Sequence, residues 1–462
     1  MSVLDNKDFE EEKVVVEEDT NFVQPSMEER REIRRKRRVR NETLATLAAA
    51  GMVLVLGVGL VAGIRGVNKL LGANTTTESS TATESDNQIA DMVESMLASE
   101  TELPTEVSQE ETANQKLDEY IDTIIAGMTL EEKVYGLIIT SPEQLTGVST
   151  ATQAGSGTQT AITEKPVGGL VYYRRNMESS DQLKEMLNNT ISYSKYPIFL
   201  AVNEGGDSAS SVQNSAIEVP AVKEPGEVTE ASEAYALGST IGTYLADLGF
   251  NVNFAPTADI LWTSGAAVED YCFGGDSAMN GEFVQEYVTG LEEKGISATL
   301  KTFPGTGNLT ESTVDGTVST DKTREDYASD FAVFKAGIDA GADFVMVSHI
   351  VASELSGGMD PCSMSSTVVT NILRGELGFE GVIITEPMNG KAITEYYQPG
   401  EAAVAALKAG CDMILLPENL EEAYQGILAG VQDGSVAEAR INDSLKRVLR
   451  VKYADKLADF AE

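Results

Sequence analysis

A short apolar run at residues 382–384 ends in a carboxylate. Its valine and isoleucines are typical of a strand buried on both faces, and Pro387 cannot continue a central strand. Glu386 is therefore expected at the carboxyl end of a buried strand, where parallel α/β folds place their chemistry. The residue type leaves two interpretations open, a working catalytic carboxylate or the remnant of one.

Ionisable and amide residues also follow several other apolar runs of the chain. Singly, each of them is explained by the fact that any strand must end in something polar. Their recurrence favours one shared site, because the carboxyl ends of parallel barrel strands meet at one mouth. These residues are Asn203, Glu204, Asn253, Asp259, Lys301 and His349.

Eight short apolar runs alternate with amphipathic segments between residues 114 and 457. Strands that alternate with helices predict βα units and a parallel sheet. Eight such units favour the α/β class and a closed (β/α)8 TIM-like barrel, with an open doubly wound sheet as the alternative. The expected strands are 136–139, 169–173, 198–202, 252–254, 298–300, 344–347, 382–384 and 413–416. The expected helices include 180–188, 232–248, 281–294, 324–340, 367–377, 401–409 and 420–433, and Thr129 is expected to cap an earlier helix.

The composition disfavours several classes of function. The 462 residues carry 34 Lys+Arg and 73 Asp+Glu, a formal net charge of −39, which makes nucleic acid an unlikely partner. The three cysteines form no CxxC pair and the chain has one histidine, so neither a disulfide framework nor a metal site is expected. The FPGTG run at residues 303–307 lacks the GK[ST] of a phosphate loop, and no cofactor is expected.

The segments before residue 114 predict a membrane anchor. Residues 1–43 are acidic and then basic, and 44–64 form an uncharged apolar stretch of about 20 residues, the length of a helix that crosses a bilayer. By the positive-inside rule, the Arg/Lys cluster places residues 1–43 in the cytoplasm and the remainder outside the cell. Residues 65–113 are rich in Thr, Ser and Glu and predict a disordered stalk. The expected localisation is the cell membrane, as a single-pass protein.

Several motifs resemble those of the family 3 glycoside hydrolases, in particular the single-barrel bacterial β-N-acetylhexosaminidases. They are MTLEEKV (128–134), PVGGLVYY (166–173), AVNEGG (201–206), GFNVNFAPTADI (249–260), ATLKTFPGTG (298–307), AGADFVMVSHI (340–350) and GVIITEPMNGKAI (381–393). The resemblance places a barrel domain at 114–457 and leaves 458–462 as a C-terminal tail. It implies retaining hydrolysis of O-glycosyl bonds and a glycan that contains N-acetylglucosamine, such as peptidoglycan, as the ligand.

The resemblance also assigns roles to individual positions, and the catalytic ones are substituted. The nucleophile position falls on Glu386, one methylene longer than the family's aspartate. The acid/base histidine falls on Val314 and its aspartate partner on Ser312, and valine has no proton to give. The expected substrate-binding residues are Lys301, which is kept, Asn203 in place of an aspartate, Tyr271 in place of an arginine, and the strand-end residues Glu204 and His349.

Three functions are compatible with these observations. The first is a membrane-anchored barrel with lost or weak hydrolysis, which binds a cell-wall glycan or a protein partner through its mouth. The second is an active exo-β-N-acetylglucosaminidase with Glu386 as nucleophile and Glu204, Glu311 or Asp315 as a substitute acid. The third is a non-enzymatic membrane interaction protein in which the barrel is a spacer.

Overall fold

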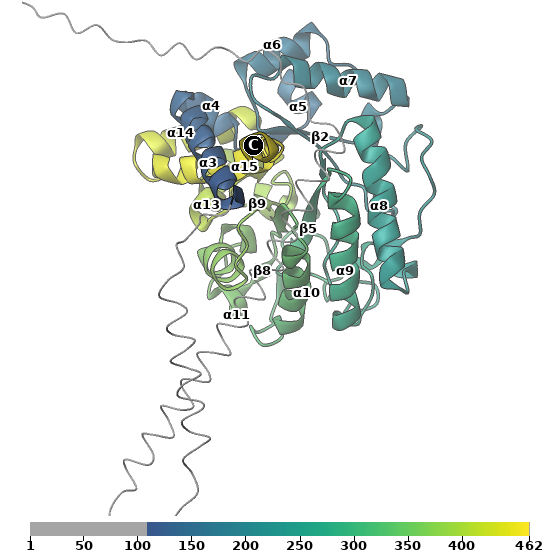
Figure 1. Cartoon of the computed structure of the whole chain (residues 1–462). Coiled ribbons are helices and arrows are strands. Elements are labelled where there is room, and N and C mark those ends of the chain that lie inside the picture. Colours follow the sequence, from purple (N-terminus) through teal and green to yellow (C-terminus); the bar gives the residue numbers. More distant parts are fainter. Residues whose placement is uncertain (1–108, 462) are drawn as a thin grey trace, which may run out of the picture.

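Eight parallel strands form the centre of the computed structural model, which describes residues 109–461 (Figure 1). Neighbouring strands follow the order β10-β1-β2-β3-β4-β5-β7-β9. Each predicted apolar run contributes one of them, with ends that differ by up to three residues. The strands are β1 (Ile138–Thr140), β2 (Gly169–Tyr172), β3 (Phe199–Val202), β4 (Val252–Asn253), β5 (Ser297–Phe303), β7 (Phe344–Val347), β9 (Val382–Thr385) and β10 (Ile414–Leu415).

The two outermost strands of this order, β9 and β10, meet through a short contact. A single parallel bridge joins Ile384 to Met413. The backbone N–H of Asp412 donates to the carbonyl of Ile383 at 2.7 Å, and that of Thr385 donates to the carbonyl of Met413 at 3.2 Å. The ring is therefore nearly closed. The predicted TIM-like barrel is confirmed, and the alternative of an open doubly wound sheet is wrong.

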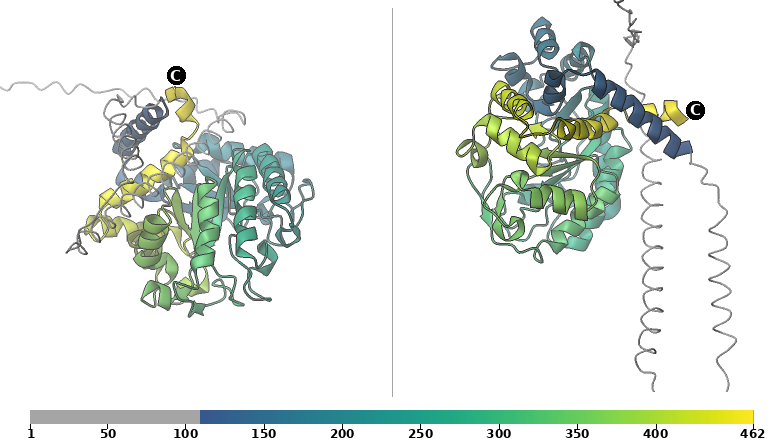
Figure 2. Two further views of the ribbon diagram at one scale, coloured as in Figure 1. Left: turned by 60° about the horizontal axis from the view of Figure 1, so that its bottom comes forward. Right: turned by 90° about the vertical axis from the view of Figure 1, so that its left-hand side faces the viewer.

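Helices surround the strands, as Figures 1 and 2 show, and α8, α9 and α10 lie side by side on one flank. Thr129 caps α4 as expected, because its side chain accepts from the N–H of Glu132 while the Glu132 carboxylate accepts from the N–H of Thr129. The segment predicted as helix 367–377 has π-helical hydrogen bonding. The helices are α3 (Gln109–Gly127), α4 (Leu130–Tyr135), α5 (Pro142–Thr146), α6 (Ser156–Glu164), α7 (Ser180–Tyr193), α8 (Ala231–Leu248), α9 (Ser277–Glu292), α10 (Ala328–Asp339), α11 (Ser353–Ser356), η5 (Thr367–Glu376), α12 (Lys391–Thr394), α13 (Pro399–Ala409), α14 (Leu420–Gln432), α15 (Glu438–Lys452) and α16 (Lys456–Ala461).

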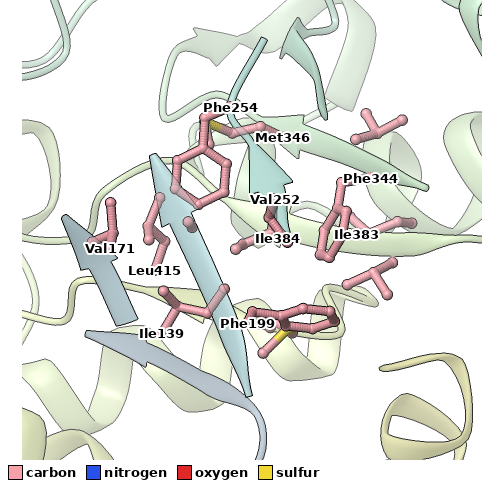
Figure 3. Close-up of a cluster of buried hydrophobic side chains, with 14 of the residues drawn as sticks. Ile139, Val171, Phe199, Val252, Phe254, Phe344, Met346, Ile383, Ile384 and Leu415 are labelled. Atoms are coloured by element: carbon pink, nitrogen blue, oxygen red, sulfur yellow. The ribbon is translucent and has the colours of Figure 1, made fainter. Parts of the chain in front are cut away.

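Large apolar side chains fill the interior of the barrel (Figure 3). Phe199 and Phe344 meet edge to face with their ring centroids 5.2 Å apart, and Phe254 and Met346 are both buried among the strands. Side chains that alternate along each strand point into this space, as in other eight-stranded barrels. Since the interior is packed, a ligand site has room at the ends of the strands rather than inside the ring.

A second, two-stranded sheet lies in the connections that leave the strand tips. β6 (Ser319–Thr320) pairs in parallel with β8 (Val351–Ala352). β6 belongs to the connection after β5 and β8 to the connection after β7. The pairing therefore joins two loops of the barrel mouth and fixes the end of the segment that carries Ser312 and Val314.

Lys452 is a partly buried cation at the opposite end of the barrel. Its Nζ atom lies 4.7 Å from the ring centroid of Phe199, at the start of β3, and it makes no ion pair with any residue in 109–461. Burial alone lowers its pKa from 10.5 to about 7. Because the folded-state pKa lies below the unfolded one, the ammonium form destabilises the fold at low pH, and this cost disappears as pH rises.

Replacement of Lys452 by methionine is expected to stabilise the protein below pH 7, by about 2–4 kcal/mol in the free energy of unfolding. The gain should decrease as the pH rises from about 7 to about 10.5. In this range the unfolded chain still binds the proton and the folded chain does not. Urea unfolding of both proteins at pH 6, 8 and 10 measures it. Lys184→Met, at an exposed position of α7, is the matched control and should give no pH-dependent gain. A gain that is equal at all three pH values would contradict the prediction.

The two ends of the described chain pack against each other. α3 begins at Gln109, inside the segment predicted as stalk, and α16 extends to Ala461, across the segment predicted as tail. The Nζ atom of Lys116 donates to the carbonyl of Phe460 at 3.0 Å, and α3 lies against α15 and α16 (Figure 2). The predicted membrane helix at 44–64 lies outside the described residues. Within residues 109–461, no helix combines the length and the apolar character needed to cross a membrane.

Candidate active site

A pocket of about 430 Å³ opens at the carboxyl ends of the strands. It brings together seven of the residues that the sequence analysis singled out, Glu311 among them, from the tips of β3, β5 and β9 and from the loops after β4 and β5. The other six are Asn203, Tyr271, Lys301, Ser312, Val314 and Glu386. The remaining walls are mostly apolar and include Val171, Phe254, Val268, Leu309, Met346, Ile350 and Leu415. The pocket is therefore a largely apolar chamber with few charged groups.

Glu386 follows the last residue of β9, as its sequence context predicted. Three donors converge on its Oε2 atom: the hydroxyl groups of Thr313 (3.1 Å) and Ser348 (3.0 Å) and the backbone N–H of His349 (2.7 Å). Its Oε1 atom accepts no hydrogen bond from any residue in 109–461. Burial raises the pKa of this carboxyl, and the three hydrogen bonds oppose the rise because they favour the charged form. One oxygen is thus fixed, and the other is left for a ligand.

His349 supports Glu386 from behind the pocket. Its Nδ1 atom lies 2.7 Å from the hydroxyl of Ser363, and its Nε2 atom lies 3.1 Å from the carbonyl oxygen of Glu386. Burial lowers its pKa to about 4, so the ring is neutral near pH 7. It follows β7 rather than lying within it, and it does not line the pocket. His349, which the sequence analysis expected to bind substrate, therefore holds the turn that carries Glu386 in place.

Lys301 lies in β5 and donates to the Oδ1 atom of Asn203 at 2.6 Å. Burial lowers its pKa, while Asp207, Asp259 and Glu386 act in the opposite direction. The end of β5 after Lys301 is held by Asp259, which accepts from the N–H and the hydroxyl of Thr302 at 2.8 and 2.7 Å. The ammonium group is thus fixed at the pocket wall, near the carboxylate at the tip of β9.

Glu204 is buried away from the pocket and has other partners. It accepts from the N–H groups of Val212 (2.7 Å) and Gln213 (3.1 Å) and from the hydroxyl of Tyr244 (2.8 Å). Burial raises its pKa to about 6. The side chain shapes the loop after β3 and does not line the pocket, in contrast to the predicted contact with substrate.

The loop that carries Ser312 and Val314 is docked over Glu386. The backbone N–H of Lys391 donates to the carbonyl of Val314 at 3.1 Å, and that of Ala392 donates to the carbonyl of Thr313 at 3.1 Å. The Val314 side chain is 59% exposed. Neither Ser312 nor Val314 can protonate a leaving oxygen near neutral pH. The docking uses backbone atoms, so it does not depend on the side chain at 314.

The three acidic residues that the sequence offers as substitutes for the missing acid lie in different places. Glu311 lines the pocket and is exposed. Glu204 is buried under the loop after β3, and Asp315 is exposed and not part of the lining. The structure therefore brings one of the three, Glu311, into the same chamber as Glu386.

Some groups at this site were not found from the sequence. Thr313 and Ser348 donate to Glu386, and Ser363 holds His349. Both lie next to positions that the sequence analysis singled out, because Ser348 directly precedes His349 and Thr313 lies between Ser312 and Val314, but no sequence feature indicated that they would donate to Glu386. Within residues 109–461, no three His, Cys, Asp or Glu side chains gather in a way that suits a metal ion.

A nearly closed parallel barrel with a carboxylate at its mouth defines a TIM-barrel protein whose site lies at the strand tips. The sequence pattern of the Glycosyl hydrolase family 3 N terminal domain matches residues 129–451, and the chain belongs to this family.

Relatives of known function and solved structures agree with this membership. The Beta-hexosaminidase of Stenotrophomonas maltophilia (strain K279a) is 30% identical over 309 residues, which are 61% of this chain and 91% of that protein. A family 3 β-N-acetylglucosaminidase from Paenibacillus sp. str. FPU-7 superposes with a TM-score of 0.66 at 30% identity. That match covers 72% of this chain and 63% of the other. The β-N-acetylhexosaminidase from Beutenbergia cavernae DSM 12333 gives a TM-score of 0.61 at 26% identity, over 70% and 98% of the two chains.

Proposed function

We propose that this protein binds a β-linked glycan containing N-acetylglucosamine, such as peptidoglycan, in its mouth pocket, and that its hydrolytic activity is lost or weak. One observation carries the proposal. The pocket keeps an open chamber with Lys301 and a carboxylate at 386, whereas the acid/base positions hold Ser312 and Val314. The names of the relatives, Beta-hexosaminidase and β-N-acetylglucosaminidase, support the choice of glycan.

The expected loss follows from the chemistry of glycoside cleavage. A retaining hydrolysis needs a nucleophile and a separate group that protonates the leaving oxygen. A positioned general acid contributes a rate factor of about 10²–10⁴. A nucleophile displaced by roughly 1 Å, as an added methylene can cause, costs about another 100-fold. Binding needs neither group to react, so a barrel with these substitutions can still hold its ligand.

Calorimetric titration of the full chain in detergent with N-acetylglucosamine and N,N′-diacetylchitobiose tests the proposal. Binding is expected, and Lys301→Ala should weaken it about tenfold or more, because a charged donor in the pocket wall is removed. Lys391→Ala changes an exposed lysine at the start of the neighbouring helix α12; it is the matched control and should bind as the unmodified chain does. Folded protein that binds none of these sugars would refute the proposal.

A second function is favoured by the free Oε1 atom of Glu386 and by the place of Glu311 in the same pocket. In that case Oε1 attacks the anomeric carbon, the bond to the leaving oxygen breaks, and Glu311 donates the proton; a water then hydrolyses the glycosyl ester and returns a proton to Glu311. Turnover of a nitrophenyl N-acetyl-β-glucosaminide that Glu386→Gln abolishes would establish it. A fluorinated sugar should then trap an adduct on Glu386, visible by mass spectrometry.

The membrane anchor completes the proposal. We infer that residues 44–64 span the cell membrane with 1–43 in the cytoplasm and the barrel facing the cell wall, since an uncharged stretch of this length behind a basic cluster favours that topology. The full chain should resist extraction from membranes by alkaline carbonate, and a variant without 44–64 should be released. Release of the full chain would contradict this part of the proposal.

A further inference from the structure

The mouth pocket carries more negative than positive charge. Among its lining residues Lys301 is the one cation, whereas Glu311 and Glu386 are both carboxylates. Position 271, where the family resemblance expects an arginine, holds a tyrosine. The imbalance bears on the charge of the sugar that fits the pocket.

Two further carboxylates are buried behind the pocket wall. Asp259 accepts four hydrogen bonds, all from the backbone N–H and hydroxyl groups of Thr302 and Thr306. These bonds favour the charged form of the carboxylate without neutralising it. Asp207 accepts from the N–H of Ala209 at 2.9 Å. Within residues 109–461, neither aspartate forms an ion pair, so their charge acts on the chamber in front of them.

Both charged groups at the back of the pocket respond to this surrounding. Burial lowers the pKa of Lys301, and Asp207, Asp259 and Glu386 oppose that shift because they favour the ammonium form. Burial also raises the pKa of the Glu386 carboxyl, and Asp259 adds to the rise by repulsion. One ammonium group therefore faces three carboxylates, in a site where water screens charge less than it does at the surface.

The carboxylate of Glu386 has an oxygen to offer to a positive group. Its Oε2 atom holds the three hydrogen bonds described above, and its Oε1 atom accepts none from residues 109–461. Lys301 does not use it, because its ammonium group donates to Asn203. A ligand ammonium group brings three donors and a positive charge, and its hydrogen bonds to a carboxylate are about twice as strong as those of a neutral N–H.

The connections around the mouth extend the same negative charge. After β3, the chain exposes Glu218, Glu224, Glu227 and Glu230, with Lys223 as the one exposed cation of this connection. Between residues 311 and 326, the connection after β5 exposes five carboxylates and one cation. A cleft bordered by one sign of charge raises the local concentration of ligands of the opposite sign.

We propose that the mouth pocket selects a positively charged amino sugar, a β-linked glucosamine unit whose free 2-ammonium group donates to Glu386. The inference deepens the proposed function and rests on it, since the glycan is then a partly de-N-acetylated one. An N-acetylated unit fills the same chamber with a neutral N–H and forgoes the charge-assisted hydrogen bond. Lys301 is left to the hydroxyl oxygens of the sugar.

Two sugars that differ by one acetyl group test the selectivity. In calorimetric titrations of the full chain near neutral pH, methyl β-glucosaminide is expected to bind at least about tenfold more tightly than methyl N-acetyl-β-glucosaminide. The preference should shrink in about 1 M NaCl, where charges at the mouth are screened. It should disappear at a pH high enough to remove the proton from the sugar amine, which tests the charge without any variant.

Variants locate the charge that is responsible. Glu386→Gln should reduce the preference to about threefold or less, because the acceptor becomes neutral. Glu311→Gln should reduce it less, since Glu311 is exposed. Glu185→Gln, at an exposed position of α7, is the matched control and should keep the preference of the unmodified chain.

The outcomes separate this inference from the function on which it rests. Equal affinities for the two sugars, or tighter binding of the acetylated one, would overturn the selectivity while the proposed function stands. A preference that survives both Glu386→Gln and the loss of the amine proton would overturn it as well. Folded protein that binds neither sugar would overturn both.

Discussion

The double variant Ser312→Asp/Val314→His is expected to hydrolyse N,N′-diacetylchitobiose about 10²–10⁴-fold faster than the unmodified chain. The factor is what a positioned general acid contributes to such reactions. The two changes place a histidine and an aspartate at the positions where the family resemblance expects the acid/base pair. The histidine would supply the proton that the leaving oxygen needs, and the aspartate would orient its ring.

The docked loop has room for this change. The Val314 side chain is 59% exposed, and the hydrogen bonds that hold the loop come from its backbone carbonyls. An imidazole at 314 therefore meets no packed core, and the contact between Thr313 and Glu386 does not depend on it. The nucleophile position also stays available, because the Oε1 atom of Glu386 is not engaged by residues 109–461.

Rates on two substrates measure the effect. A sugar is a poor leaving group and depends on the acid, whereas nitrophenolate leaves readily, so the gain should be larger for chitobiose than for the nitrophenyl glycoside. Ser312→Asp/Val314→Ala is the matched control and should show no gain. Unchanged chitobiose hydrolysis in a folded variant that still binds the sugar would mean that the missing acid is not what limits this site.

Asp412→Ala is expected to lower the free energy of unfolding by about 3–5 kcal/mol, the range measured when one partner of a buried ion pair is removed. Asp412 is fully buried just before β10. Its Oδ2 atom accepts from Arg374 at 2.6 Å and from the N–H of Ile383 at 3.0 Å. Its Oδ1 atom accepts from the hydroxyl of Ser444 at 2.8 Å.

The variant would leave several positive charges without their partner. Arg440 and Arg447 also approach the Oδ1 atom of Asp412, at 3.4 and 3.3 Å. The N–H of Ile383 in β9 would lose its acceptor near the narrow contact that closes the ring. Because this cluster lies at the opposite end of the barrel from the pocket, sugar affinity should not change in protein that remains folded.

Urea unfolding followed by circular dichroism measures the loss. Asp339→Ala is the matched control, because Asp339 forms an exposed pair with Lys335 on one helix and such pairs contribute less than about 1 kcal/mol. Ser444→Ala removes one of the hydrogen bonds to Asp412 and should give a smaller loss of about 1–2 kcal/mol, which keeps the test informative if Asp412→Ala does not fold. A loss at Asp412 no larger than that at Asp339 would contradict the expectation.

The sequence by itself determined the repeating units of this protein. Apolar runs bounded by glycine, proline and polar residues are local signals, and all eight strands formed where they were predicted. The end of β9 before Pro387 and the capping of α4 by Thr129 were also predictable from local sequence, since each depends on residues only two or three positions apart. Eight βα units favoured a barrel with its mouth at the carboxyl ends of the strands, and the contact between β9 and β10 decided against an open sheet.

Only the tertiary structure decided which strand-end residues face the pocket. Glu204 turns inward to Tyr244, His349 braces the turn after β9, and Glu311 reaches the chamber. Thr313 meets Glu386 across 73 positions of sequence. These contacts depend on the paths of long loops and on the closure of the ring, which bring together residues that share no local pattern.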